Sequence, residues 1–347
     1  MSIRIGVVGF GYWGPNLFRA FASHPGYEVI AVADPRGVNR EKARRIDGRL
    51  LTFDDGAELI ESGKIDAVAI ATPVATHREL AARALRRGKH VLVEKPLCTR
   101  AEEGVELIEL SKRHGAALLV DHVYVFHDAV RKMKGLKTSG ALGAVSYYDS
   151  LRVNLGLFQP DMNVLWDLAP HDLSIIDYLF EEEPVHIEAT GYSHVNSHLP
   201  DIVYVTAHYA SRMIAHLNLS WMSPVKVRRI AIGGSRQMVV WDDLNPEERL
   251  KIYNSGIDVR PEDERSAIVP TYRIGDIYSP RLQGNEPLAR LVDHFGRVVC
   301  DNERSDVDGA AGLRIVRQLE AAQKALDASL DKVSGRKPSA PLRPPAS

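Results

Sequence analysis

The chain has 347 residues, of which 45% are hydrophobic and 26% are charged, and its formal net charge is −1. This composition is typical of a globular protein with room for two domains, and the charge argues against nucleic acid or a membrane surface as partner. The two cysteines, Cys98 and Cys300, suit a reducing compartment. Because the sequence shows neither a signal-peptide pattern nor an apolar run of roughly 20 residues, we expect a cytoplasmic protein.

The first predicted elements are a buried strand at residues 3–8, an abrupt glycine turn and the start of a helix. Gly9, Gly11 and Gly14 stand in the G-x-G-x-x-G spacing. This spacing permits a tight turn, the close approach of a pyrophosphate and close packing of the helix on the strand. The free N–H groups at the helix start add an anion site. The stretch therefore predicts a dinucleotide site.

A second predicted strand, at residues 28–33, ends at Asp34, which lies twenty residues beyond Gly14. An acidic residue there binds the adenosine ribose hydroxyls and repels a 2′-phosphate, so we expect NAD(H) rather than NADP(H). Arg36 argues the other way, since it can pair with that phosphate or stack on adenine. NADP therefore stays open at this point.

Short apolar strands are also predicted at residues 67–71, 90–94 and 116–121, with helices between them. This alternation predicts a doubly wound parallel sheet covered on both faces, with ligands beyond the carboxyl ends of its strands. Besides the glycine turn, two strand ends carry polar residues. One reads Thr72-Pro73 with His77 nearby, and the other reads Glu94-Lys95-Pro96.

The alternation stops after Asp121. A long strand at 144–154 and a helix that carries Asp167 and His171 are followed by a strand-rich middle, which predicts an α+β domain with a large, mainly antiparallel open sheet. The expected domains are 1–121, 122–285, closing helices at 286–333 and a disordered tail at 334–347. Apolar residues on both sides of the sheet predict a homodimer or homotetramer through its open face.

The Rossmann-like start, the T-P-x-x-x-H turn, the E-K-P word and the D-x-x-x-H segment together resemble the Gfo/Idh/MocA oxidoreductases. The words around Asn154 and Gln159 resemble the branch that oxidises or reduces sugar nucleotides at ring C3, although the usual Gly-Gly before Asp167 is replaced by Val164-Leu165-Trp166. The resemblance implies a nicotinamide cofactor, Lys95 at the junction of nicotinamide and substrate, a catalytic histidine at His171 and a cis Lys95–Pro96 bond.

These arguments give three sets of candidate residues. The catalytic candidates are Lys95, His171 and Asp167. The cofactor-binding candidates are Gly9, Phe10, Gly11, Tyr12, Trp13, Gly14, Asp34, Arg36, Thr72, Pro73, His77, Glu94 and Lys95. The substrate-binding candidates are Tyr124, Arg152, Asn154, Asn163, Trp166 and His171, with Arg152 as the expected anion partner. We expect no metal, because no metal-ligand spacing is present.

Removing a hydride from an alcohol carbon requires a base for the hydroxyl proton and a cation near the developing alkoxide. His171 can accept a proton at neutral pH, whereas Lys95 can serve as charged donor or, if desolvated, as base. The sequence leaves this choice open. The resemblance implies an NAD(P)-dependent oxidoreductase that transfers a hydride between nicotinamide and a ring carbon, C3 in this branch, of a nucleotide-linked sugar, with a free sugar, sugar phosphate or inositol as alternative substrate. A non-catalytic cofactor-binding regulator is the other alternative, since fold does not fix function.

Overall fold

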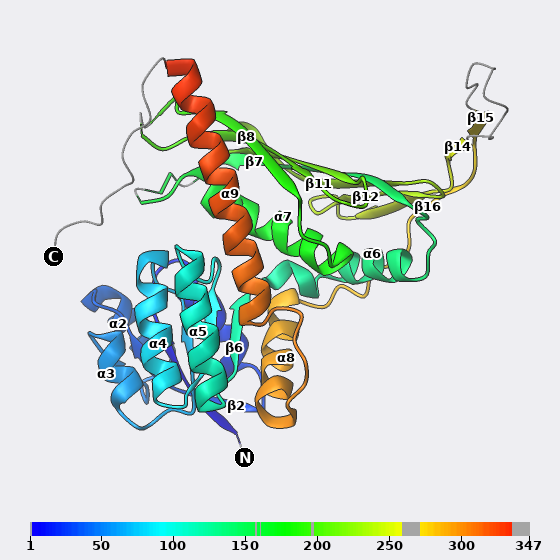
Figure 1. Cartoon of the computed structure of the whole chain (residues 1–347). Coiled ribbons are helices and arrows are strands. Elements are labelled where there is room, and N and C mark those ends of the chain that lie inside the picture. The colour runs from blue at the N-terminus through cyan, green and yellow to red at the C-terminus, as the bar shows by residue number, and fades with distance from the viewer. Residues whose placement is uncertain (1, 157, 160, 196–197, 259–270, 335–347) are drawn as a thin grey trace. The chain divides into compact units, whose positions relative to one another are not determined.

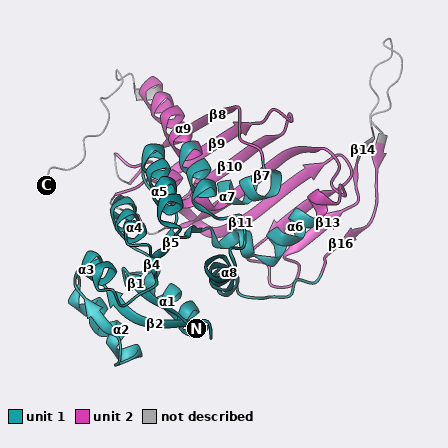
Figure 2. Ribbon diagram, turned by 60° about the horizontal axis from the view of Figure 1, so that its bottom comes forward, with its two compact units in different colours: residues 1–135, 173–181, 281–317 teal, residues 136–172, 182–280, 318–347 magenta. Residues whose placement is uncertain are grey.

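A computed structural model of the chain describes residues 2–156, 158–159, 161–195, 198–258 and 271–334 (Figure 1). The chain forms two compact units (Figure 2). Unit 1 comprises Met1–Gly135, Leu173–Glu181 and Arg281–Arg317, and unit 2 comprises Leu136–Asp172, Glu182–Pro280 and Gln318–Ser347. Neither unit is contiguous, in contrast to the expected domains, because residues 281–317 return to unit 1. Most of the expected tail, residues 335–347, lies outside the described residues.

Unit 1 contains a six-stranded sheet in the order β3-β2-β1-β4-β5-β6, in which every neighbouring pair is parallel. The predicted doubly wound sheet is therefore confirmed, with β3 as a strand that the sequence patterns did not predict. Its elements are β1 (Ile3–Val8), α1 (Gly14–Ala22), β2 (Tyr27–Ala33), α2 (Gly37–Ile46), β3 (Leu51–Phe53), α3 (Gly56–Glu61), β4 (Ala67–Ile70), η1 (Val74–Thr76), α4 (His77–Arg86), β5 (His90–Glu94), α5 (Ala101–His114), β6 (Leu118–Asp121), η2 (Val123–Phe126) and α8 (Pro287–Asp301).

Alternate residues along the parallel strands enter two separate cores. On β1, Val7 belongs to one core and Val8 to the other, and on β5 the same holds for Leu92 and Val91. All four side chains are buried. Because successive side chains of a strand point to opposite faces, the two cores cover the two faces of the sheet. Ligands can then bind only at the ends of the strands.

Unit 2 contains an eight-stranded sheet in the order β16-β13-β12-β11-β7-β10-β9-β8. The prediction of a mainly antiparallel sheet is confirmed, and the exception is the parallel pair β7–β10. The remaining elements lie wholly or partly in unit 2. They are α6 (Asp128–Thr138), β7 (Val145–Leu155), α7 (Val164–Phe180), β8 (His186–Tyr192), β9 (Ile202–His208), β10 (Ile214–Ser220), β11 (Met222–Gly234), β12 (Met238–Asp242), β13 (Leu250–Tyr253), β14 (Gly256–Asp258), β15 (Thr271–Arg273), β16 (Ile277–Tyr278) and α9 (Gly309–Ser334). Helices α6, α7 and α9 contribute residues to both units.

The sheet of unit 2 has one buried face and one exposed face. Along β9, Val203 and Val205 are buried, whereas Tyr204 between them is 40% exposed. The first turns of α7 pack on the buried face, where Asp172 hydrogen-bonds to Ser150 of β7. Among the described residues, no helix combines the length and the apolar character that a bilayer crossing requires.

Candidate active site

The turn between β1 and α1 has a backbone that only glycine fits at two positions. Gly9 has φ +89°, and a Cβ added there would lie 2.4 Å from the carbonyl oxygen of Ala71. A Cβ on Gly14 would lie 2.0 Å from the carbonyl oxygen of Gly9. These close approaches bring the N-terminus of α1 against β1 and β4 and make the turn a cradle of backbone atoms. Such a cradle fits a pyrophosphate.

Asp34 lies just beyond β2 and is only 3% exposed. Its carboxylate accepts hydrogen bonds from the N–H of Phe10 at 2.8 Å, the N–H of Arg36 at 2.9 Å and the amide of Asn39 at 3.0 Å. Burial would raise the pKa of Asp34, but these hydrogen bonds and the charge of Arg36 together hold it below its usual value. Asp34 is therefore an ionised group at the sheet edge where the ribose was expected.

The ends of β4 and β5 are joined by His77. Its Nδ1 lies 2.9 Å from the carbonyl oxygen of Pro96, and its Nε2 lies 2.8 Å from that of Thr72. The ring is 1% exposed, so His77 supports the two turns from inside the fold. Burial lowers the pKa of His77, partly offset by the two carbonyl contacts, and the charge of Lys95 lowers it further. The Lys95–Pro96 bond is cis, which confirms the prediction.

A buried polar group at the ends of β5 and β6 was missing from the predicted site. Asp121 is 1% exposed, and its Oδ2 accepts a hydrogen bond from the indole N–H of Trp13 at 2.7 Å. Its side chain also hydrogen-bonds to that of Glu94, the residue opposite it on β5. Neither ring nitrogen of the adjacent His122 has a hydrogen-bond partner in the described part of the chain. The sequence signal that could have predicted this group is an acidic residue at the end of each of two neighbouring strands, Glu94 and Asp121.

The start of α7 in unit 2 is fixed by hydrogen bonds from other elements. Asn163 caps the helix by accepting from the N–H of Trp166 at 3.2 Å. The side chains of both residues donate to the amide oxygen of Gln323 in α9, at 2.9 Å and 3.1 Å. One turn further, Asp167 accepts from the indole N–H of Trp221 at 3.1 Å. These two predicted substrate-binding residues, Asn163 and Trp166, are thus part of the support of the helix.

Arg152 of β7 donates to Asp172 of α7 through Nε at 2.8 Å and Nη2 at 3.2 Å. Ser150 donates to the same carboxylate at 2.7 Å, and the two charged side chains are 5% and 0% exposed. The guanidinium was expected to be a partner for a substrate anion. In the structure it neutralises a buried carboxylate next to His171 in the chain, so a substrate anion would have to compete with that ion pair.

The predicted residues therefore fall in both units. Lys95 and Tyr124 belong to unit 1, whereas Asp167 and His171 lie four residues apart on α7 in unit 2. Their spacing places the last two on one face of the helix. Other candidates differ in exposure: the side chain of Tyr12 is 82% exposed, and Phe10 is fully buried with the core. The amide of Asn154 donates to the neighbouring Leu155 carbonyl at 3.0 Å.

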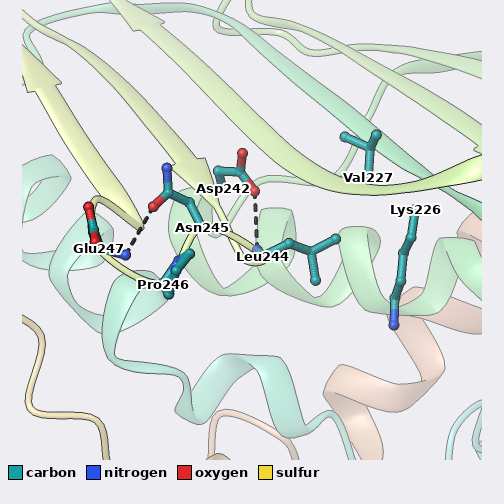
Figure 3. A pocket seen from close by; sticks show the side chains of 7 residues that line it. All are labelled: Lys226, Val227, Asp242, Leu244, Asn245, Pro246 and Glu247. Carbon is teal, nitrogen blue, oxygen red and sulfur yellow. Dashed lines mark hydrogen bonds between the residues drawn. The ribbon is translucent and has the colours of Figure 1, made fainter.

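A hollow of about 350 Å³ lies elsewhere in unit 2 (Figure 3). Within it, Asp242 accepts from the N–H of Leu244 and Asn245 accepts from that of Glu247, so these side chains stabilise their own turn. No predicted site residue lines it. Its lining residues are Lys226, Val227, Asp242, Leu244, Asn245, Pro246 and Glu247.

Comparison with known proteins places this geometry in a family. Residues 3–122 match the oxidoreductase family model with an NAD-binding Rossmann fold, GFO_IDH_MocA. Residues 130–240 match the GFO/IDH/MocA C-terminal domain. The NAD cofactor expected from the glycine turn and Asp34 agrees with the description of the first match.

Similar proteins include a UDP-N-acetylglucosamine 3-dehydrogenase from Acidithiobacillus ferrooxidans, 27% identical over 96% of this chain and 100% of that protein. Its solved structure superposes with a TM-score of 0.80 at 26% identity, covering 95% of this chain and 99% of that one. An inositol 2-dehydrogenase from Saccharopolyspora erythraea is 32% identical over 53% of this chain and 56% of its own length. This chain belongs to the Gfo/Idh/MocA family of NAD-dependent sugar oxidoreductases.

Proposed function

We propose that this protein transfers a hydride between NAD and ring carbon C3 of a nucleotide-linked sugar. The observation that carries the proposal is the end-to-end similarity to the UDP-N-acetylglucosamine 3-dehydrogenase, which spans both units. A similarity confined to unit 1 would support cofactor use alone. Because unit 2 carries Asp167 and His171 and is matched as well, the similarity extends to the part of the chain proposed to receive the sugar.

In this proposal the residues of the chain bind, orient and move protons. The cradle at Gly9 and Gly14 holds the pyrophosphate, and the Asp34 carboxylate accepts from the ribose hydroxyls. NAD, when bound, accepts or donates the hydride. His171 and Lys95 act at the sugar hydroxyl, one as base and one as the charged group that stabilises the alkoxide oxygen. Asp167, held by Trp221, orients His171 or contacts a second hydroxyl.

A second substrate class is supported by one observation. The inositol 2-dehydrogenase is 32% identical to this chain, against 27% for the UDP-N-acetylglucosamine 3-dehydrogenase, although over only 53% of this chain. Free polyols have no anion, and in the structure Arg152, the anion partner expected from the sequence, is bound to Asp172. A cyclic polyol such as an inositol is therefore the alternative substrate.

The assay that decides between them measures the absorbance of NAD(P)H with UDP-, dTDP- and GDP-sugars, sugar phosphates, free sugars and inositols. We expect turnover with at least one nucleotide sugar. Turnover with a free polyol and with no nucleotide sugar would leave only the coarser family activity. Product analysis by NMR then shows whether the oxidised carbon is C3.

We further propose a cytoplasmic homodimer or homotetramer that associates through the exposed face of the sheet in unit 2. The side chains of Tyr204 and Ile214, which are 40% and 39% exposed, lie on neighbouring strands of this face. Sedimentation of the parent chain and of Y204E tests this. A parent that sediments as a monomer would contradict the proposal, and we expect the variant to dissociate.

A further inference from the structure

The side chains at the carboxyl ends of β5 and β6 form a set of buried and partly buried groups to which the proposed reaction assigns no role in proton transfer. Glu94 and Asp121 are opposite each other in the parallel register and hydrogen-bond through their side chains. A carboxylate oxygen can only accept, so a hydrogen bond between two carboxyl groups requires one proton between them. Asp121 is 1% exposed, and burial of this kind disfavours the charged form.

We infer that Glu94 and Asp121 share one proton at neutral pH, and that this pair is a positioning group that presents a single negative charge to Lys95. The inference deepens the proposed function and rests on it for the role of Lys95. Two like charges in one buried site cannot both ionise easily, so the pair keeps one proton and one charge. Lys95 follows Glu94 directly, and its charge acts on Asp121.

A hydrogen bond from the glycine turn holds the Asp121 carboxyl group in place. Trp13, in the glycine turn, donates its indole N–H to Oδ2 at 2.7 Å. In the described residues Oδ1 accepts from no N–H or O–H group. The pKa of Asp121 is raised by burial, and the hydrogen bonds of Glu94 and Trp13 and the charge of Lys95 oppose that rise.

The neighbouring imidazoles do not supply a positive charge to balance the carboxyl pair. His122 follows Asp121 and is 1% exposed; burial, helped by the charge of Lys95, lowers its pKa to about 3. The pKa of His77 is lowered as well, mainly by burial. At neutral pH both rings carry no charge. Lys95 is thus the cation of this group, and the carboxyl pair is its counter-charge within unit 1.

Three amide variants separate the proton from the charge. In D121N or E94Q, the new amide donates to the remaining carboxylate, so one negative charge and the hydrogen bond persist while the shared proton is lost. In the double variant E94Q/D121N the charge is lost as well. D66N serves as a matched control, because Asp66 also lies at a strand end of this sheet but is 41% exposed and pairs with Arg4.

Infrared spectroscopy tests the proton without any turnover. The parent and D66N should show the C=O stretch of a protonated carboxylic acid at neutral pH, and D121N and E94Q should each lack it. If the band is equal in all four proteins, the inference is overturned, whatever the substrate screen shows. Because either single variant suffices, the test survives the loss of one of them to misfolding, which circular dichroism detects.

The pH profile of turnover tests the charge. Each single variant should lose about threefold in kcat, and the double variant tenfold or more with KM nearly unchanged. Removing the negative charge also leaves the Lys95 cation without this counter-charge, so the alkaline limb of the pH profile of the double variant should move to lower pH. A double variant with the parental alkaline limb would show that the pair has only a structural role. If no substrate turns over, the proposed function fails while the infrared result still stands.

Discussion

The glycine turn of unit 1 and the β7–α7 contact of unit 2 are stabilised by different kinds of interaction. In the turn, Gly9 and Gly14 leave room for backbone atoms, and Asp34 is held by the backbone N–H groups of Phe10 and Arg36. Between β7 and α7 the decisive contacts are side chain to side chain. Arg152 binds Asp172 across twenty residues of chain.

This difference determines how each region responds to substitution. A turn made of backbone contacts tolerates most side-chain changes, provided that its glycines stay. A contact made of two buried charges depends on both partners, because removing one leaves the other unpaired in a medium that solvates it poorly. Truncating a single side chain should therefore cost more unfolding free energy at the β7–α7 contact than in the glycine turn.

The largest effect is expected for R152A, which removes the guanidinium from the buried Asp172 carboxylate while Ser150 still donates to it. Breaking a buried pair in this way costs about 3–5 kcal/mol of unfolding free energy. Urea denaturation measures it. The control is R228A on the same sheet, whose partner Asp243 lies 3.4 Å away and whose own side chain is 36% exposed. Such exposed pairs contribute about 0–1 kcal/mol. Equal losses in both variants would remove the distinction.

The second prediction compares one catalytic candidate from each unit. K95M and H171A should each lower kcat by about 10² or more, because each removes a group proposed to act on the hydroxyl proton or the alkoxide. The dissociation constant of NAD, measured by fluorescence titration, should stay within about threefold in H171A. A fully active variant at either position would assign the chemistry to another residue, with Tyr124 as the next candidate.

The same difference explains which features could be predicted from the sequence. The glycines and the E-K-P word each lie within a short stretch of sequence, and Asp34 stands at a regular distance from the glycines, so these positions follow from spacing alone. The partners of Arg152, Asp167 and Asn163 lie between 20 and 160 residues away in the chain, and no local pattern pairs them. Arg152 was therefore assigned to a substrate anion, although its partner is a carboxylate of the same chain.

Asp121 shows the same limit inside the better predicted unit. The end of β6 was correctly located at this residue. Its pairing with Trp13, however, depends on the glycine turn lying across the sheet, 108 residues earlier in the chain. The parallel order of β5 and β6 was implied by the alternation of strands and helices, but the register that sets Glu94 opposite Asp121 was not.

The pH dependence of stability should trace to a buried histidine of unit 1. Burial lowers the pKa of His122 to about 3, from 6.5 in the unfolded chain. Between these values the unfolded chain binds the extra proton, so stability falls as pH falls, by up to about 1.4 kcal/mol per pH unit for this one group. H122N should flatten that slope between pH 6.5 and 3 and leave the slope above pH 7 unchanged. Identical slopes in parent and variant at acid pH would contradict the burial of a neutral ring.

The smallest effect is expected for the choice of cofactor, which tests the turn itself. Asp34 is ionised and fixed at the end of β2, so it should accept from the ribose 2′-OH and repel a 2′-phosphate. We expect the parent to bind NAD(H) about tenfold more tightly than NADP(H), a difference of about 1.4 kcal/mol. Titration of both cofactors against protein fluorescence measures it.

Arg36 is the residue that could reverse this order, and the structure shows what restrains it. Its Nε lies 3.7 Å from Asp34 Oδ1, its side chain is 66% exposed, and its Nη2 would lie 3.1 Å from a Cβ on Gly11. The guanidinium thus reaches the cradle while paired with the carboxylate. D34S should release it and raise the affinity for NADP(H), and R36A should lower that affinity while changing NAD(H) binding by less than about threefold. If the parent already prefers NADP(H), Arg36 outweighs Asp34, and a side chain rather than the backbone of the turn decides the cofactor.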